Sequence, residues 1–177
     1  NAVIKERRNG QGAEVAGVTV EGKVAYLSLV QLQAGVTWQK SHYTRPEKWS
    51  KDSSVPAEKR IFRTPDWYGY FTATYSPVKP LNIALSGTYT GSMIVQHMKG
   101  YIPKDMAVTT PDFFDMNLKI SYDFSLYKFI TLQLNAGVQN IFNAYQRDFD
   151  QGKERDSGYI YGPSMPRSYF AGAKLMF

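Results

Sequence analysis

The sequence holds few side chains that could carry out covalent chemistry. It has two histidines, His42 and His97, and no cysteine, which excludes a disulfide scaffold, a cysteine nucleophile and Cys-ligated zinc. Serine and aspartate are scattered through polar segments, so no nucleophile, base and orienting group form a triad. We therefore predict no catalytic residue, no resident cofactor and no enzymatic activity.

Two groups of residues have the chemistry of metal ligands. His97, with Met98 beside it and Met93 nearby, could ligate haem or copper, although two soft ligands in a loop are more often incidental. Carboxylates of a later loop offer the oxygens that calcium prefers, and they are Asp148, Asp150, Glu154 and Asp156. Basic residues at 147, 153 and 155 are interleaved with them, which favours internal salt bridges. We expect no metal site.

Aromatic and histidine side chains in the expected loops could contact a chelate or a macrocycle by stacking. Ordering of the loops explains these residues equally well. The weak ligand-binding candidates are His42, Trp49, His97, Tyr101, Tyr145, Tyr159 and Tyr161.

The elements that position these residues are predicted to be strands. Apolar and polar residues alternate strictly in seven runs, which is the period of a β-strand with two different faces. The predicted strands are 13–21, 29–39, 67–75, 81–91, 114–124, 130–139 and 169–177. Apolar residues at helical spacing are missing outside them, so we predict an all-β, antiparallel up-and-down sheet.

The connections alternate in length. Tight links at 22–25, 76–80 and 125–129 alternate with long polar segments at 40–66, 92–113 and 140–168. Short turns on one side and long loops on the other are typical of outer-membrane β-barrels. Strands of about nine to eleven residues also fit a transmembrane span better than the usual five or six.

Aromatic residues bracket the apolar faces of the predicted strands. In three strands the two aromatics are eight positions apart, as in Trp67 and Tyr75. Eight tilted residues climb about 20 Å, close to the ~25 Å apolar band between aromatic girdles. The predicted girdle is Trp38, Trp67, Tyr75, Tyr89, Phe114, Tyr122, Tyr169 and Phe177.

The opposite faces of these strands are polar, which suggests water there. Residues expected to face this polar side are Gln31, Gln33, Asn82, Thr88, Asn117, Lys119, Gln133, Asn135 and Gln139. A soluble β-sandwich or ligand-binding β-barrel, the competing interpretation, explains such a face less well than a membrane barrel with a polar interior.

Composition and charge argue against a helical membrane protein and a nucleic-acid-binding protein. No apolar run is long enough for a transmembrane helix, and no signal peptide is visible. The net charge is +6, but much of the basic excess falls in the 40–66 loop together with acids. No nucleic-acid-binding module is indicated, because no aromatic surface carries a regular basic stripe. The loop could instead contact lipopolysaccharide phosphates.

Five stretches resemble the C-terminal end of a TonB-dependent outer-membrane receptor. They are GAEVAGVTVEG at 12–22, RTP at 63–65, NAGVQNIFN at 135–143, PR at 166–167 and the terminal Phe177. The last strand also resembles the signal read by the barrel assembly machinery, carried here by Gly172, Leu175 and Phe177.

The resemblance implies that residues 1–177 are the seven C-terminal strands and loops of a barrel of about 22 strands, whose plug domain lies outside this chain. Residues 1–10 would belong to an extracellular loop. The implied function is import of a scarce large solute, such as a ferric siderophore, haem or cobalamin, across the bacterial outer membrane. The inner-membrane TonB complex would supply the energy through the plug. The alternative is a stand-alone eight-stranded barrel with an adhesion or structural role.

Overall fold

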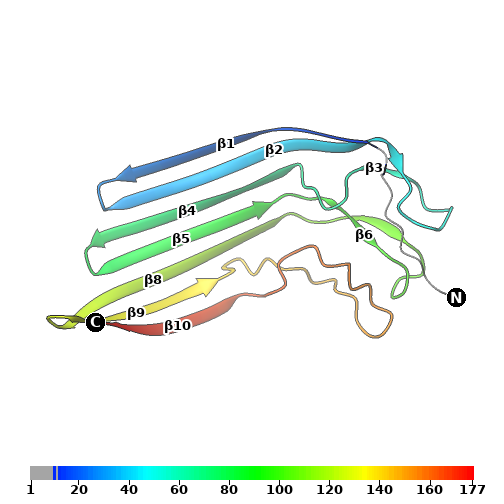
Figure 1. The fold of residues 1–177 in the computed structure, drawn as a ribbon. Helices are drawn as coiled ribbons and strands as arrows, with labels where there is room; N and C mark the ends of the chain where they lie inside the picture. The colour runs from blue at the N-terminus through cyan, green and yellow to red at the C-terminus, as the bar shows by residue number, and fades with distance from the viewer. Residues whose placement is uncertain (1–9, 11) are drawn as a thin grey trace.

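The computed structural model describes residues 10 and 12–177, and the expectation for residues 1–10 lies almost wholly outside them. The described chain is built from strands without a helix, as predicted (Figure 1). None of its elements is a helix able to cross a membrane. The strands are β1 (Ala13–Tyr26), β2 (Val30–Glu47), β3 (Glu58–Arg60), β4 (Trp67–Val78), β5 (Leu81–Thr90), β6 (Ile94–His97), β7 (Met106–Thr109), β8 (Phe113–Tyr127), β9 (Ile130–Gln139) and β10 (Ser168–Met176).

Seven of these strands form one antiparallel meander, and they are the seven that the alternation predicts. Their order in the sheet is β1-β2-β4-β5-β8-β9-β10, so each pairs with the next one along this path. The short strand β3 pairs with β2, and β6 pairs with β7 as a separate ribbon. Among the described residues β1 and β10 each have one neighbour in the sheet, so the sheet is open at both edges.

Several predicted boundaries were wrong. The tight link expected at 22–25 lies inside β1, where Gly22 pairs with Ala34 and Lys23 with Gln33, and the turn comes at 27–29 instead. Leu27 has a positive φ of 51° there, so a residue other than glycine takes the left-handed conformation that this hairpin turn requires. Strand β2 likewise continues past 39 to Glu47, and β3, β6 and β7 lie in segments predicted as loops.

The pairing register aligns the alternation of all seven strands. Cross-strand partners share a face of the sheet. One such row is wholly apolar and runs through Val24, Leu32, Ala73, Leu85, Leu118, Val138 and Tyr169. A neighbouring row on the other face is polar and runs through Lys23, Gln33, Thr72, Ser86 and Asn117. The sheet therefore has one apolar face and one mainly polar face, as predicted.

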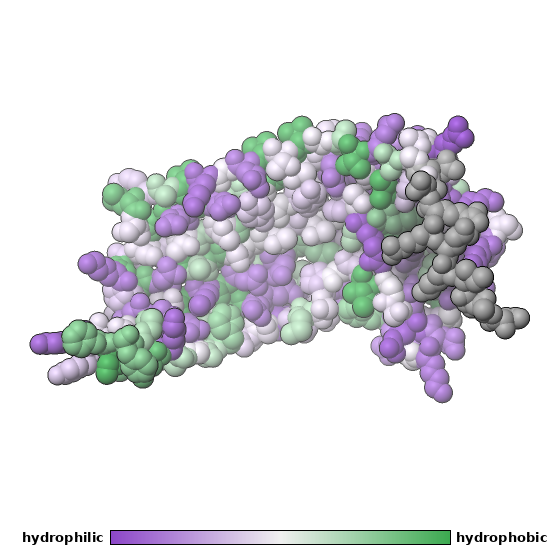
Figure 2. All heavy atoms as spheres, in the orientation of Figure 1, coloured by the Kyte–Doolittle hydropathy of each residue, from purple (hydrophilic) through white to green (hydrophobic). Residues whose placement is uncertain are grey.

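In β2 and β8 burial on the two faces is the reverse of that in a water-soluble sheet. Within β2, Val36 on the apolar face is 46% exposed and Thr37 on the polar face 8%, and within β8 Ile120 is 42% exposed and Ser121 9%. The edge strand β1 is exposed on both faces. Hydrophobic residues gather on the surface along β1 and at the turn between β8 and β9 (Figure 2). The polar face is thus the more sheltered side of β2 and β8, whereas on β4 its residues Tyr68 and Tyr70 are exposed.

The buried hydrophobic residues of the described chain lie at the loop end of the sheet. They are Met93, Ile94, Val95, Phe113 and Tyr159. Met93, Val95 and Tyr159 form one small core, against which Val108 and Tyr161 pack. This core joins the β6–β7 ribbon to the segment between β9 and β10, and so it gives the long loops a fixed structure.

Candidate functional site

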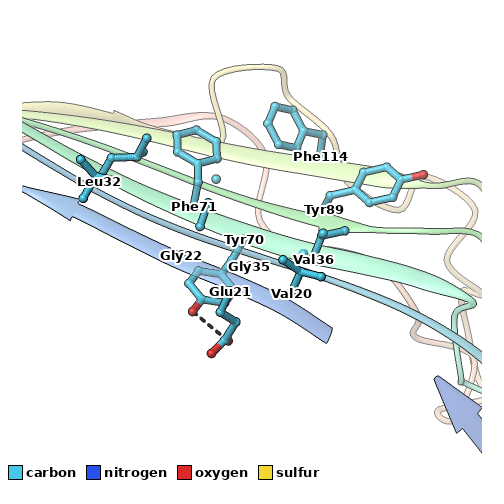
Figure 3. Close-up of a pocket in the computed structure, with 14 residues that line it drawn as sticks. Val20, Glu21, Gly22, Leu32, Gly35, Val36, Tyr70, Phe71, Tyr89 and Phe114 are labelled. Atoms are coloured by element: carbon cyan, nitrogen blue, oxygen red, sulfur yellow. Dashed lines mark hydrogen bonds between the residues drawn. The ribbon is translucent and has the colours of Figure 1, made fainter. Parts of the chain in front are cut away.

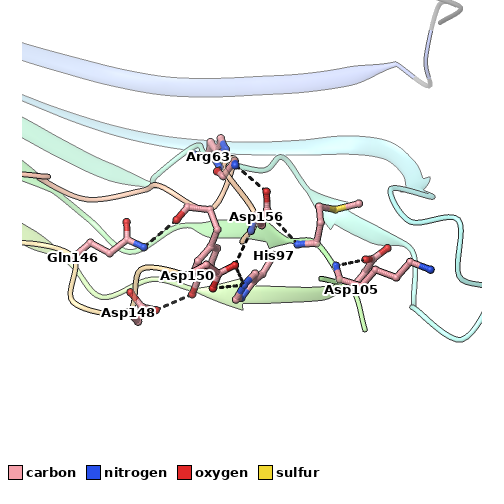
Figure 4. Close-up of polar contacts among 11 residues, drawn as sticks. Arg63, His97, Asp105, Gln146, Asp148, Asp150 and Asp156 are labelled. Atoms are coloured by element: carbon pink, nitrogen blue, oxygen red, sulfur yellow. Dashed lines mark hydrogen bonds and ion pairs between the residues drawn. The ribbon is translucent and has the colours of Figure 1, made fainter. Parts of the chain in front are cut away.

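Three long segments meet at the loop end and hold a group of polar and aromatic side chains in place (Figure 4). Arg63 comes from the segment between β3 and β4, and His97 ends β6. The remaining members come from the segment between β9 and β10. We call this group the loop cluster, and it consists of Arg63, His97, Gln146, Asp148, Asp150, Asp156, Tyr159 and Tyr161.

His97 is fixed on both its ring face and its ring edge. Its ring stacks on Tyr159, with centroids 3.7 Å apart and planes 8° from parallel. Its Nε2 lies 3.0 and 2.9 Å from the two carboxylate oxygens of Asp150, and both side chains are almost fully buried. A metal could reach Nε2 only by displacing Asp150, which argues against the haem or copper site considered from the sequence.

Asp148 accepts hydrogen bonds from two tyrosine hydroxyls. Tyr161 donates at 2.6 Å and Tyr159 at 2.8 Å. Burial by itself would raise the pKa of Asp148, but these hydroxyl donors outweigh it and hold that pKa below its ordinary value. Burial, and then the bond to Asp148, raises the pKa of Tyr159 to about 12 and that of Tyr161 further. The arrangement keeps both phenols neutral beside an ionised carboxylate.

Arg63 connects the segments, and Gln146 holds the segment between β9 and β10 folded back on itself; the sequence did not single out either residue for these roles. Gln146 is 1% exposed, donates to the carbonyl of Tyr159 and accepts from the amide of Tyr161. The Arg63 guanidinium donates to the carbonyls of Ile160 and Gly158, and its backbone amide donates to Ile94. No periodicity or motif chemistry indicates such contacts, although Arg63 does lie in the RTP stretch at 63–65.

The remaining loop carboxylates bind backbone amides. Asp156 accepts from the amides of Met98 and Gly158, both at 2.8 Å. Asp105 accepts from the Ser50 hydroxyl at 2.5 Å and from the Lys99 amide at 2.7 Å, and these two donors lower its pKa. Within the described chain, the salt bridges expected between the acids of 148–156 and the interleaved basic residues do not form, because tyrosine, histidine and amide donors take the carboxylates. No group of three or more metal-binding side chains is found in that same part.

The structure brings three of the predicted ligand-binding candidates together, namely His97, Tyr159 and Tyr161. The other four lie apart from them. His42 is on β2, 3.4 Å from a Glu14 oxygen, and Trp49 packs edge-on against a phenylalanine. Tyr145 lies under the Arg147 guanidinium, and Tyr101 is exposed.

A polar hollow of about 390 Å³ lies beneath this end of the sheet, between the polar face and residues 163–168. Asn117 and Gln139, two residues predicted to face the polar side, line it. Asn117 accepts the amide of Asn140, a buried residue with φ 51° whose side chain donates to the carbonyls of Ala144 and Met165. Asn140, within the NAGVQNIFN stretch, thus anchors the start of the long segment after β9.

All eight predicted girdle residues are exposed, and those within strands lie on the apolar face. Trp38 and Trp67 are cross-strand partners with ring centroids 6.4 Å apart, and Tyr89 pairs with Phe114. In the last strand, Gly172 lies against the Asn135 amide, Leu175 is exposed, and Phe177 comes just after the end of β10. Their roles in a membrane and in assembly stay predictions.

The loop cluster is held together by its own side chains. Its hydrogen-bonding groups are largely satisfied by one another, which makes it a rigid base for the exposed loop residues around it. No protein-family model matches this chain, and no curated protein is significantly similar to it in sequence.

Proposed function

We propose that this chain supplies seven transmembrane strands of an outer-membrane receptor that imports a scarce large solute, such as a ferric siderophore, haem or cobalamin. The observation that carries the proposal is the apolar face, which continues across the whole seven-stranded path opposite a mainly polar face. Contiguous apolar surface of this extent is unfavourable in water and marks an interaction surface. In a membrane barrel each face has a favourable environment, because lipid covers the apolar face and the polar face lines the interior.

The open edges favour the C-terminal part of a larger barrel. Unpaired strand edges in a bilayer leave backbone groups without hydrogen-bond partners, so further strands must pair with β1 and β10. In the proposed receptor these strands and the plug lie elsewhere in the protein, and the TonB complex acts through the plug. The barrel assembly machinery would read the signal at Gly172, Leu175 and Phe177. Outer-membrane lipid and lipopolysaccharide would surround the apolar face.

The loop cluster fits a receptor whose outward loops capture the solute by binding alone. It holds three long segments in one arrangement, so exposed aromatics around it can be presented without a large ordering cost. The alternative is a small stand-alone barrel with an adhesion or structural role. The size of the native protein in isolated outer membranes, measured with an antibody to the Phe177 end, separates the two. A band several times larger than 20.1 kDa supports the receptor.

Adjacent residues on β9 provide the test of membrane insertion. Leu134 lies on the apolar face, whereas Gln133 lies on the polar face and donates to Asp123 at 2.7 Å. Leu134→Arg should block assembly into the outer membrane, because a lipid-facing arginine near the bilayer midplane costs about 2–4 kcal/mol. Gln133→Arg should assemble normally, because its neighbour Asp123 can pair with the new charge.

Assembly is measured as the amount of protease-resistant protein in isolated outer membranes. Ala171→Arg, on the apolar face of β10, should behave as Leu134→Arg does. Equal tolerance of arginine on both faces would show that the apolar face does not contact lipid.

A further inference from the structure

The apolar face is hollowed where it crosses β1, β2, β4 and β5 (Figure 3). This groove has a volume of about 600 Å³, and its floor is made by small residues, Gly22, Ala34, Gly69 and Gly87. Its walls are Val20, Val24, Leu32, Val36, Phe71, Tyr89 and Phe114. The floor is open at Gly22, where an added Cβ would meet no atom within 4 Å.

The polar residues that border the groove turn away from it. Tyr70 donates to Glu21 at 3.1 Å on the opposite face of the sheet, whereas Phe71 and Phe114 stand on the groove side (Figure 3). The lining that an occupant meets is therefore hydrocarbon and aromatic, with the Tyr89 hydroxyl at one side. Such a lining accepts an acyl chain and offers little to a polar ligand.

Basic residues follow the groove toward the loop end on the same face. Lys40 lies two positions beyond Trp38 along β2, and Arg60 on β3 is the cross-strand partner of His42. Both are exposed, and neither has an acidic partner within 4.0 Å among the described residues. Acids beside this rim are engaged elsewhere, since Glu14 contacts His42, Glu58 accepts from the backbone amides of Lys59 and Arg60, and Asp112 accepts from Tyr89.

We propose that the groove and this basic rim bind one lipid with an anionic phosphate headgroup. An acyl chain lies in the groove, and the phosphate lies between Lys40 and Arg60. The four steps along the strand from Val36 to Lys40 span roughly 13 Å, which is within the length of a glycerolipid. The inference rests on the proposed function, because a lipid reaches this face only if the strands cross a bilayer.

Trp38 and Trp67 beside the groove report on a bound lipid. Protein carrying Trp49→Phe, which removes the third tryptophan, is purified from membranes and placed in phosphatidylcholine vesicles. Tryptophan fluorescence is then measured as brominated phosphatidylglycerol or brominated phosphatidylcholine replaces the host lipid. Brominated phosphatidylglycerol should quench at a lower mole fraction, by roughly fivefold for each basic residue that contacts the headgroup.

Lys40→Gln and Arg60→Gln should each reduce this preference, and the double variant should abolish it. Gly22→Leu, which fills the open part of the floor, should weaken quenching by the anionic lipid without disturbing the sheet. Lys23→Gln is the control, because Lys23 lies on the polar face.

Two results would overturn the inference, and they differ. Equal quenching by both lipids, unchanged in the Lys40 and Arg60 variants, rejects the lipid site while leaving the strands in the membrane. Absence of quenching by either lipid rejects the membrane placement and the site together.

Discussion

Proton positions in the loop cluster depend on one carboxylate shared by two phenols. Asp148 stays ionised because the Tyr159 and Tyr161 hydroxyls donate to it, and both hydroxyls stay protonated because they are buried and bonded to that carboxylate. Tyr159 also stacks on His97, whose Nε2 contacts Asp150. Loss of the proton from either tyrosine hydroxyl would therefore disturb the contact between β6 and the segment between β9 and β10.

The cluster should come apart at high pH. The pKa of Tyr159 is about 10 in an unfolded chain and about 12 in the folded one, so its contribution to stability is complete below pH ~10. It is lost as the pH rises through 12. In a tyrosinate absorbance titration, Tyr159→Phe should remove a group that titrates near pH 12.

Tyr101→Phe, at an exposed position outside the loop cluster, is the control and should leave the Tyr159 titration step in place. At acid pH the lowered pKa of Asp148 has the opposite consequence, because its contribution is lost as the pH falls through that value. Loss of the same titration step in both tyrosine variants would contradict the assignment.

The sequence indicated only part of this site. His97, Tyr159 and Tyr161 were candidates because their side chains can contact a ligand. In the structure their rings pack against one another instead. Gln146 carries no chemical signature, and its importance comes from its burial and from hydrogen bonds to Tyr159 and Tyr161 in the same segment. Pairing of distant loops is set by tertiary packing, which residue type and spacing do not encode.

Strands were predicted well where both faces differ in polarity. Alternation fixes the face of every residue in the seven long strands, and a register shift of one would invert it. The ribbon of β6 and β7 escaped prediction because each strand has four residues and β6 is buried along most of its length, so no alternation develops. Strand β3 has three residues and is likewise too short for an alternation to be recognised.

Arg63 should control the attachment of the loops to one another. Arg63→Lys keeps the charge but cannot donate to two carbonyls from one planar group, so loop opening should become easier by about 1–2 kcal/mol. Hydrogen exchange at the amides of Tyr159 and Tyr161 should accelerate accordingly. Arg45→Lys, an exposed change on β2, should leave this exchange unaltered. Unchanged exchange in the Arg63 variant would show that the loops hold without it.

At the scale of the whole molecule, the sheet is organised by the contrast between one apolar and one mainly polar face. Its hydrophobic residues point away from the chain, and the only substantial hydrophobic cluster in the described part holds the loops. The molecule therefore depends on its surroundings for the stability that a soluble domain obtains from its own core. The unpaired backbone groups of the edge strands β1 and β10 add to this dependence.

The 177-residue chain produced alone in detergent should not form a closed monomer. Its edge strands β1 and β10 present unpaired backbone groups, which favour association between copies. Light scattering after size-exclusion chromatography should show mixed assemblies, and gel mobility should not shift on heating. A monodisperse monomer with a heat-dependent shift would contradict the open sheet.

The joined loops also limit how the outward end of this protein could be re-engineered. Arg63 and His97 each make contacts that only the segment between β9 and β10 supplies, so a loop grafted singly from another protein would arrive without its counterparts. Exchange of the three segments as a set preserves those contacts. Natural variants with a different recognition surface should accordingly differ in all three segments together, with the strands below them unchanged.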